Sequence, residues 1–102
     1  AGKTTFVQHW LRQAGYSGVV QSPTYALMNE YYIGQQTVIH ADLYRLAAPD
    51  ELLYLDVRDW SERATHIFIE WAQNGGDYLP AADVFCQFAL RDGRRYLSVA
   101  AA

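Results

Sequence analysis

The first hydrophobic pattern in the chain predicts an amphipathic helix. Apolar residues recur three and four positions apart between Lys3 and about Ala14, and a glycine follows at position 15. Residues at this spacing share one face of an α-helix, and glycine is a common helix stop. Beyond the helix, Val19–Val20 predicts a short strand. Pro23 predicts an ordered loop or extended segment, because the residue before a proline avoids helical geometry.

The middle of the chain changes to the two-residue period of β-strands. The stretch "YYIGQQTVIHAD" predicts two strands joined by a turn at residues 34–36, with Val38, His40 and Asp42 on one face of the second strand. The run "HIFIEW", His66–Trp71, is compact and apolar, which is typical of a strand fully buried inside an α/β sheet. His40 and His66 lack metal-ligand spacing and are expected to be core or supporting residues.

Two further elements complete the predicted fold. The segment "AAPDELLYLDVRDW" predicts a short helix, with Pro49 at its start and Asp50 and Glu51 near its positive N-terminal end. Strand-like alternation over residues 84–90 and 94–99 surrounds Asp92-Gly93 and predicts an antiparallel hairpin. Residues 1–102 are therefore expected to form a single α/β domain with a C-terminal antiparallel hairpin.

Composition narrows the classes of protein to which this domain can belong. Apolar residues make up 51% and charged residues 19% of the 102 residues, which is typical of a folded domain. The net charge of −3 argues against a broad electrostatic surface for nucleic acid, and no apolar run is long enough to cross a bilayer. Cys86 is the single cysteine, which excludes an internal disulfide and fits a reducing compartment. Its place in an alternating apolar stretch predicts a small buried side chain.

The opening "AGKTTF" matches the second half of a phosphate-binding loop. In the full pattern, G-x-x-x-x-G-K-[ST], backbone N–H groups wrap the phosphates, the lysine reaches the β- and γ-phosphates, and the hydroxyl ligates Mg²⁺. Here Ala1 takes the last variable position, followed by Gly2, Lys3 and Thr4 at the start of the predicted helix, where the helix dipole favours anions. The motif alone is equally compatible with a solvated lysine at a helix start. Other residues must therefore show whether the chain has a nucleotide site.

Three oxygen-bearing side chains could complete a site for a magnesium nucleotide. Asp42 and Glu70 each end a predicted strand, and the carboxyl ends of strands in α/β sheets carry functional residues. A carboxylate at Glu70 is costly unless it is paired, metal-bound or exposed. Thr24 can offer a hydroxyl to Mg²⁺ or phosphate, as switch loops do. The alternatives are a turn or cap for Asp42, a salt bridge of Glu70 with Arg45 or Arg58, and a loop-stabilising turn for Thr24.

Several segments, taken together and in order, resemble one family. "GKTTF", "SPTYALMNEY", "HADLYRL", "DELLYLDVRDW" and "IEW" are similar to segments of the bacterial TsaE (YjeE) proteins, small ATPases needed for threonylcarbamoyladenosine formation on tRNA. The corresponding family runs read approximately GAGKTTF, SPTYTLVEPY, H-x-DLYRL, P-x-E-L-x-x-x-G-[IL]-x-[DE]-Y and EW. The resemblance extends from Ala1 to at least Pro80. It departs from the family pattern where Asp56 replaces a glycine, Trp60 is the following aromatic residue, and Ala72 replaces a frequent proline.

The resemblance implies a phosphate-loop NTPase-like α/β fold with a mixed, mainly parallel sheet. It also implies binding and hydrolysis of ATP with Mg²⁺ in a cytoplasmic complex with the TsaB–TsaD pair, in which TsaD performs the transfer to adenosine. Contact with tRNA is then only indirect, and no membrane is involved. The implied site comprises the nucleotide-binding residues Gly2, Lys3, Thr4, Thr5, Thr24 and Trp71, the metal-binding residues Thr4, Asp42 and Glu70, and the catalytic residues Lys3 and Glu70.

The position of the motif at the chain start implies that part of the ATPase domain is missing. The first glycine of the loop and the strand that feeds it are expected to precede Ala1. With half of the N–H cradle absent, we expect this segment by itself to bind ATP poorly and to be marginally folded. Two other functions remain as alternatives: another phosphate-loop NTPase or small-molecule kinase, and a non-hydrolytic nucleotide-binding adapter.

Overall fold

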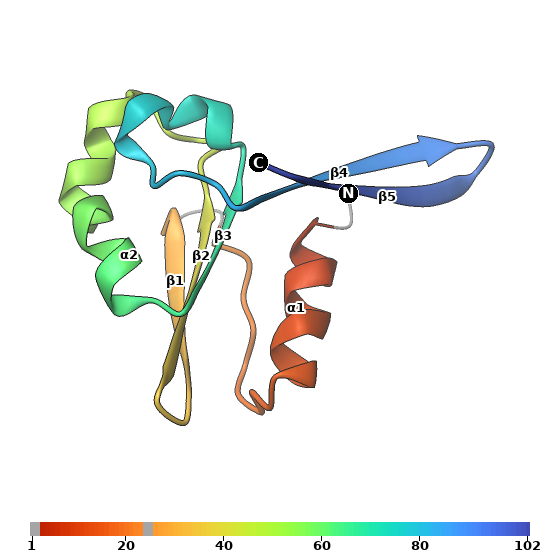
Figure 1. Cartoon of the computed structure of the whole chain (residues 1–102), viewed down its shortest axis with the longest axis horizontal. Coiled ribbons are helices and arrows are strands. Elements are labelled where there is room, and N and C mark those ends of the chain that lie inside the picture. Colours follow the sequence, from red (N-terminus) through yellow and green to blue (C-terminus); the bar gives the residue numbers. More distant parts are fainter. Residues whose placement is uncertain (1–2, 24–25) are drawn as a thin grey trace.

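A mixed three-stranded sheet forms the centre of the molecule. The computed structural model describes residues 3–23 and 26–102. The strands β1 (Met28–Ile33), β2 (Gln36–Asp42) and β3 (His66–Glu70) follow the order β1-β2-β3 (Figure 1). β1 is antiparallel to β2, and β2 is parallel to β3. The predicted mixed sheet is confirmed, although parallel pairing does not predominate among the described strands.

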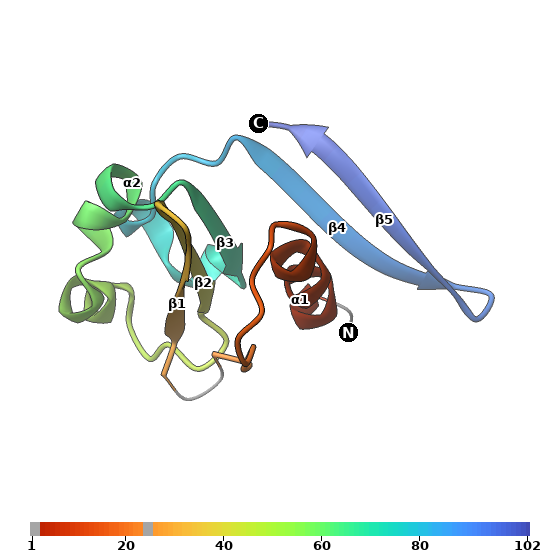
Figure 2. The same ribbon diagram turned by 90° about the horizontal axis from the view of Figure 1, so that it is seen from below.

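Helix α1 (Lys3–Gln13) covers one face of this sheet (Figures 1 and 2). Its buried residues Val7 and Leu11 pack in a cluster with Tyr31 of β1 and Val38 of β2. The helix is followed by Gly15, whose φ of +105° lies in the region that glycine adopts most readily. The predicted helix and its stop are therefore confirmed.

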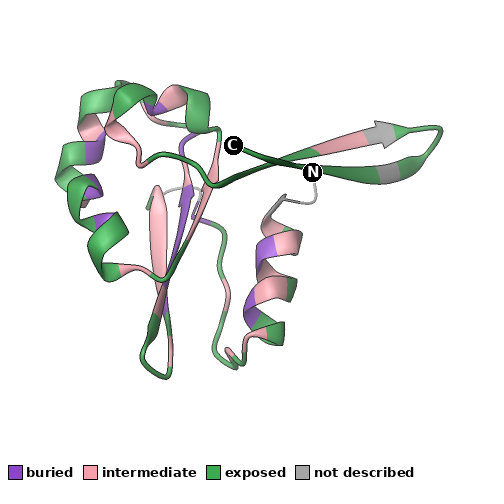
Figure 3. Ribbon diagram, in the orientation of Figure 1, coloured by how far each residue is buried: buried purple, intermediate pink, exposed green. Residues whose placement is uncertain are grey.

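The opposite face of the sheet is covered by short helical turns. These are η1 (Pro49–Leu55), η2 (Val57–Asp59) and α2 (Trp60–Arg63), and they precede β3. The purple segments of Figure 3 show that buried residues concentrate where these turns and α1 meet the sheet. The cluster beneath the turns consists of Ile39, Ala41, Leu43, Leu52, Val57 and Trp60. Two cores thus sandwich β2, which positions the end of this strand firmly.

The predicted short helix at "PDELLYL" is confirmed and takes the tighter 3₁₀ form. Pro49 lies at its start, and the Glu51 carboxylate accepts hydrogen bonds from the backbone N–H groups of Ala47 and Ala48, at 2.7 and 2.9 Å. These N–H groups lie just before the helix, where no backbone carbonyl of the helix can accept their hydrogen bonds. The turn therefore begins where the sequence predicts, with Glu51 closing it.

The C-terminal hairpin is also confirmed, but it stands apart from the sheet. β4 (Val84–Arg91) and β5 (Arg94–Ala101) pair with each other in a separate two-stranded sheet. In Figure 1 the hairpin extends past the start of α1, where Phe88 contacts Phe6 at a ring-centroid distance of 5.8 Å. Cys86 is exposed, so its predicted burial is wrong. The reason is that no second layer among the described residues covers its part of the hairpin.

Two other predictions about strands need correction. Val19–Val20 forms no strand, and Val19 is 73% exposed. The following segment is held to β1 by side-chain hydrogen bonds to Gln21 instead of a backbone ladder. β3 is present but is not fully buried, because His66 is exposed and the remaining residues are half-buried. Within the described residues β3 is an edge strand, so one side of it lacks a neighbouring strand.

No helix within residues 3–23 and 26–102 has the length and apolar character needed to span a membrane.

Asp56, which stands where the family pattern has glycine, lies in a left-handed conformation. Its φ and ψ are 55° and 40°, and its side chain makes no capping hydrogen bond. Left-handed geometry strains residues with a Cβ, and glycine relieves that strain. We therefore expect Asp56→Gly in the full-length protein to raise the free energy of unfolding by about 0.5–1 kcal/mol in urea denaturation. Asp56→Val should lower it, and a destabilised glycine variant would contradict this explanation.

Candidate magnesium-nucleotide site

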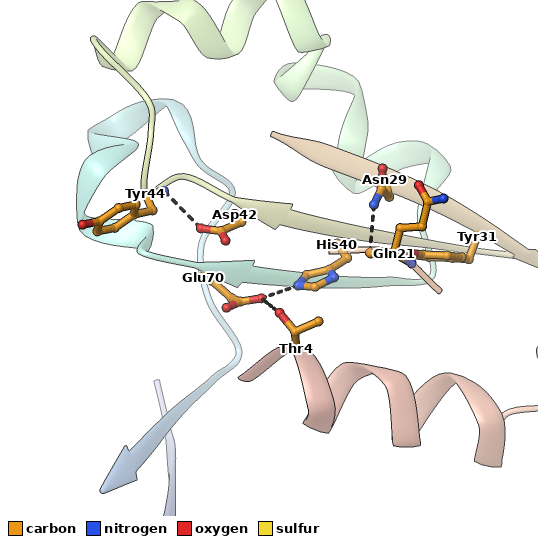
Figure 4. Close-up of polar contacts among 8 residues, drawn as sticks. All are labelled: Thr4, Gln21, Asn29, Tyr31, His40, Asp42, Tyr44 and Glu70. Carbon is orange, nitrogen blue, oxygen red and sulfur yellow. Dashed lines mark hydrogen bonds and ion pairs between the residues drawn. The ribbon is translucent and has the colours of Figure 1, made fainter. Parts of the chain in front are cut away.

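Two carboxylates and the start of α1 meet at one edge of the sheet. Asp42 and Glu70 are the last residues of β2 and β3 and are partners in the parallel register. Partner residues in neighbouring strands lie about 4.8 Å apart, so the two carboxylates share one edge. Figure 4 shows Thr4, in the first turn of α1, pointing toward Glu70. The structure therefore brings together three predicted residues that are distant in sequence.

Glu70 receives two contacts on the same oxygen. The Thr4 hydroxyl donates to its Oε2 at 3.4 Å, and Nε2 of His40 lies 2.5 Å from that atom (Figure 4). The Glu70 side chain is 12% exposed and the His40 side chain is fully buried. A carboxylate with so little exposure needs polar partners to offset its lost hydration. The polar partners of Glu70 are therefore a histidine and a threonine, where an arginine was the alternative expected from the sequence.

Asp42 has a turn-forming role in addition to its place at the site. Its Oδ1 accepts a hydrogen bond from the backbone N–H of Tyr44 at 3.1 Å, and its own N–H donates to the Leu27 carbonyl at 2.8 Å. A side-chain oxygen that accepts from the N–H two residues later is a common turn device of aspartate. These bonds fix the direction of the chain as it leaves β2. The turn interpretation is thus correct and compatible with a ligand role.

Trp71 continues the chain from Glu70 in a strained conformation. Its φ of 58° is positive, which is uncommon for a bulky side chain, and its ring lies 4.9 Å from that of Tyr44. Both aromatic rings are exposed, Trp71 by 39% and Tyr44 by 61%. Unusual backbone geometry often accompanies functional sites. The predicted contact of Trp71 with the nucleotide stays a prediction, and the structure places the residue beside the carboxylates.

The remaining predicted residues belong to the loop and to the segment before β1. Lys3 opens α1 and Thr5 is exposed in its first turn. Gly2 and Thr24 lie outside the described residues. Three hydrogen bonds hold Gln21, which precedes Ser22-Pro23-Thr24 in the chain: its carbonyl accepts from Asn29 and Tyr31, both at 3.1 Å, and its N–H donates to the Tyr31 hydroxyl at 3.3 Å.

His40 is the member of this site whose contact the sequence reasoning missed. The sequence predicts only a core or supporting histidine, and places it on the same strand face as Asp42. The parallel register pairs His40 with Phe68, so Glu70 lies two residues further along on that face. The contact could have been found only by knowing this register. His66, the other strand histidine, is exposed, and its ring lies 4.6 Å from that of Trp10.

Comparison with known proteins identifies the class of the domain and then its family. A solved structure of YdiB from Bacillus subtilis superposes with a TM-score of 0.66 and 23% sequence identity, over 98% of this chain and 60% of that one. This likeness supports the predicted phosphate-loop NTPase-like α/β fold. The sequence model of the family "Threonylcarbamoyl adenosine biosynthesis protein TsaE" matches residues 1–96. The chain belongs to the TsaE family, which takes part in threonylcarbamoyladenosine biosynthesis on tRNA.

Individual relatives carry the same family name. The tRNA threonylcarbamoyladenosine biosynthesis protein TsaE of Haemophilus influenzae is 40% identical over 99% of this chain. The protein of that name from Treponema pallidum is 32% identical over 98% of this chain. The chain spans 64% of the length of the first relative and 74% of the second.

Proposed function

We propose that the full-length protein binds ATP with Mg²⁺ and hydrolyses it. The observation that carries this proposal is the convergence of Thr4 and Glu70, at 3.4 Å, beside Asp42 at the carboxyl ends of two parallel strands. A helix start that follows a Gly-Lys-Thr sequence supplies an anion site, and the strand ends supply carboxylates. Membership in the TsaE family agrees with this chemistry.

The donor atoms fit a magnesium ion. Mg²⁺ prefers hard oxygen ligands, and the Thr4 hydroxyl and the Asp42 and Glu70 carboxylates are of this kind. These three residues would hold the ion. When bound, Mg²⁺ neutralises negative charge on the β- and γ-phosphates during phosphoryl transfer.

The other residues are assigned by their place in the phosphate-loop pattern. Gly2 and Lys3 would bind the phosphates, and Thr5 would contact the α-phosphate side. Thr24 would offer a hydroxyl from the loop before β1. Glu70 would orient the attacking water or support Mg²⁺, since its carboxylate accepts a hydrogen bond from the Thr4 hydroxyl at the start of α1. Trp71 would border the nucleotide.

The proposed partners are the TsaB and TsaD proteins, in a cytoplasmic complex that modifies tRNA. Hydrolysis by this protein would support turnover of the complex, and TsaD would carry out the transfer to adenosine. The net charge of −3 agrees with contact to tRNA through the partners and not through this domain. The family's role in threonylcarbamoyladenosine biosynthesis supports this assignment.

Release of inorganic phosphate tests the proposal. We expect the full-length protein to hydrolyse ATP slowly by itself and faster with TsaB–TsaD and Mg²⁺, in a steady-state phosphate-release assay. Omitting Mg²⁺ is the control and should abolish the stimulated rate. Transfer of the γ-phosphate to a small metabolite would favour the kinase alternative. ATP binding without hydrolysis, in the presence of both partners, would favour a non-hydrolytic adapter.

A further inference from the structure

His40 is an unusual residue for its position. Among the residues that the structure describes, it is the only polar or charged one that is fully buried, and it lies on β2, sandwiched between the two cores. Its Nε2 contacts Glu70 Oε2 at 2.5 Å. Its Nδ1 is also buried and has no hydrogen-bond partner within the described residues. A buried ring nitrogen without a hydrogen bond costs stability, so the presence of this histidine in the core calls for an explanation.

The two ring nitrogens can be assigned from these contacts. A carboxylate only accepts hydrogen bonds, so the ring nitrogen that faces Glu70 must carry the hydrogen. The proton of a neutral imidazole is then on Nε2, and Nδ1 is a buried acceptor without a hydrogen-bond partner among the described residues. The bond therefore runs in one direction, from the ring to the carboxylate.

Resting on the proposed function, we propose that His40 is a positioning residue for Glu70. Its Nε2–H holds Oε2 and so sets the orientation of the carboxylate beside Thr4 and Asp42. The His40 ring is held by its full burial on β2, while the Glu70 side chain at the end of β3 is 12% exposed. A fully buried donor thus orients a more exposed carboxylate. Residues that orient metal-binding carboxylates through such bonds tune affinity and activity without touching the metal.

A matched pair of substitutions tests this assignment in the full-length protein with TsaB–TsaD. The amide nitrogen of glutamine can take the place of Nε2, whereas asparagine is shorter and places its amide near Nδ1. We expect His40→Asn to lower kcat for ATP hydrolysis about 10–100-fold, with KM for ATP changed by no more than about threefold. The Mg²⁺ concentration needed for half-maximal binding of ATP should rise. His40→Gln should keep most of the wild-type kcat and should need nearly the same Mg²⁺ concentration for half-maximal binding of ATP.

His66→Gln is the control, because His66 is an exposed histidine on the neighbouring strand. It should leave kcat and the Mg²⁺ requirement unchanged. An asparagine variant that matches the wild type would overturn the proposal, and so would a glutamine variant as impaired as the asparagine one. Melting temperatures establish that each variant is folded.

If the asparagine variant does not fold, a measurement on the wild-type protein tests the proposed role of His40. Nitrogen-15 NMR of the histidine rings should show His40 with its proton on Nε2 and none on Nδ1. A proton found only on Nδ1 would overturn the proposal. This measurement is independent of the proposed function, which fails separately if the wild-type protein does not bind ATP with Mg²⁺.

Discussion

Glu70→Gln in the full-length protein is expected to reduce ATP hydrolysis stimulated by TsaB–TsaD by at least about 100-fold, the loss expected when a reacting group such as the attacking water is misplaced. Glutamine keeps the size of the side chain and can still contact Thr4 and His40. It removes the negative charge that would orient water or bind Mg²⁺. Steady-state phosphate release, at saturating ATP and Mg²⁺, measures the effect. Lys3→Ala should abolish the same activity by removing the cation expected at the phosphates.

Glu62→Gln provides a matched control for the loss of one carboxylate. Glu62 is exposed on α2, on the opposite side of the sheet from α1 in Figure 1. Its substitution should leave hydrolysis unchanged. Full activity in both the Glu70 and the Lys3 variants would show that these residues do not carry hydrolysis and would contradict the roles proposed for them. Circular dichroism establishes that the inactive variants are folded.

Trp60→Ala is expected to lower the free energy of unfolding by about 3–5 kcal/mol, the usual cost of deleting a large buried aromatic side chain. Trp60 is fully buried beneath the turns that cover the sheet, and its Nε1 donates to the Leu55 carbonyl at 2.9 Å. Its removal would leave a cavity and an unpaired carbonyl. Urea denaturation of the full-length protein measures the loss. Since whole domains have only about 5–15 kcal/mol of stability, this variant should be close to unfolding.

Two other substitutions separate the causes of this effect. Trp60→Phe keeps most of the apolar surface but loses the hydrogen bond, so it should cost less than the alanine variant. Tyr54→Ala removes an aromatic side chain that is 90% exposed, and it should change stability by no more than about 0.5 kcal/mol. Equal losses from Trp60→Ala and Tyr54→Ala would contradict the role assigned to burial.

The local elements were predictable because their signals are local. Helical spacing and Gly15 define α1, and a proline followed by acidic residues defines the turn at Pro49. The alternation around Asp92-Gly93 defines the hairpin, whose register pairs Arg91 with Arg94. Each of these signals lies within a few residues of the element that it specifies.

The predictions that were wrong concern which surfaces of the elements are buried. Cys86 and His66 lie in strands of apolar or alternating pattern, yet both are exposed. Periodicity shows that one face of a strand is apolar, but whether another layer covers that face depends on how distant elements pack. The strand predicted at Val19–Val20 does not form for a similar reason. Residues with high β propensity form a strand only where a neighbouring strand pairs with them.

The sequence by itself determined most of the elements, the family and the positions of Thr4, Asp42 and Glu70, because motif order and strand ends are properties of the linear chain. Tertiary structure alone decided that these residues meet, and that His40 is the partner of Glu70. The physical reason is the parallel register of β2 and β3, which aligns residues about thirty positions apart and which no local pattern encodes. The full burial of His40 then gives that contact its rigidity.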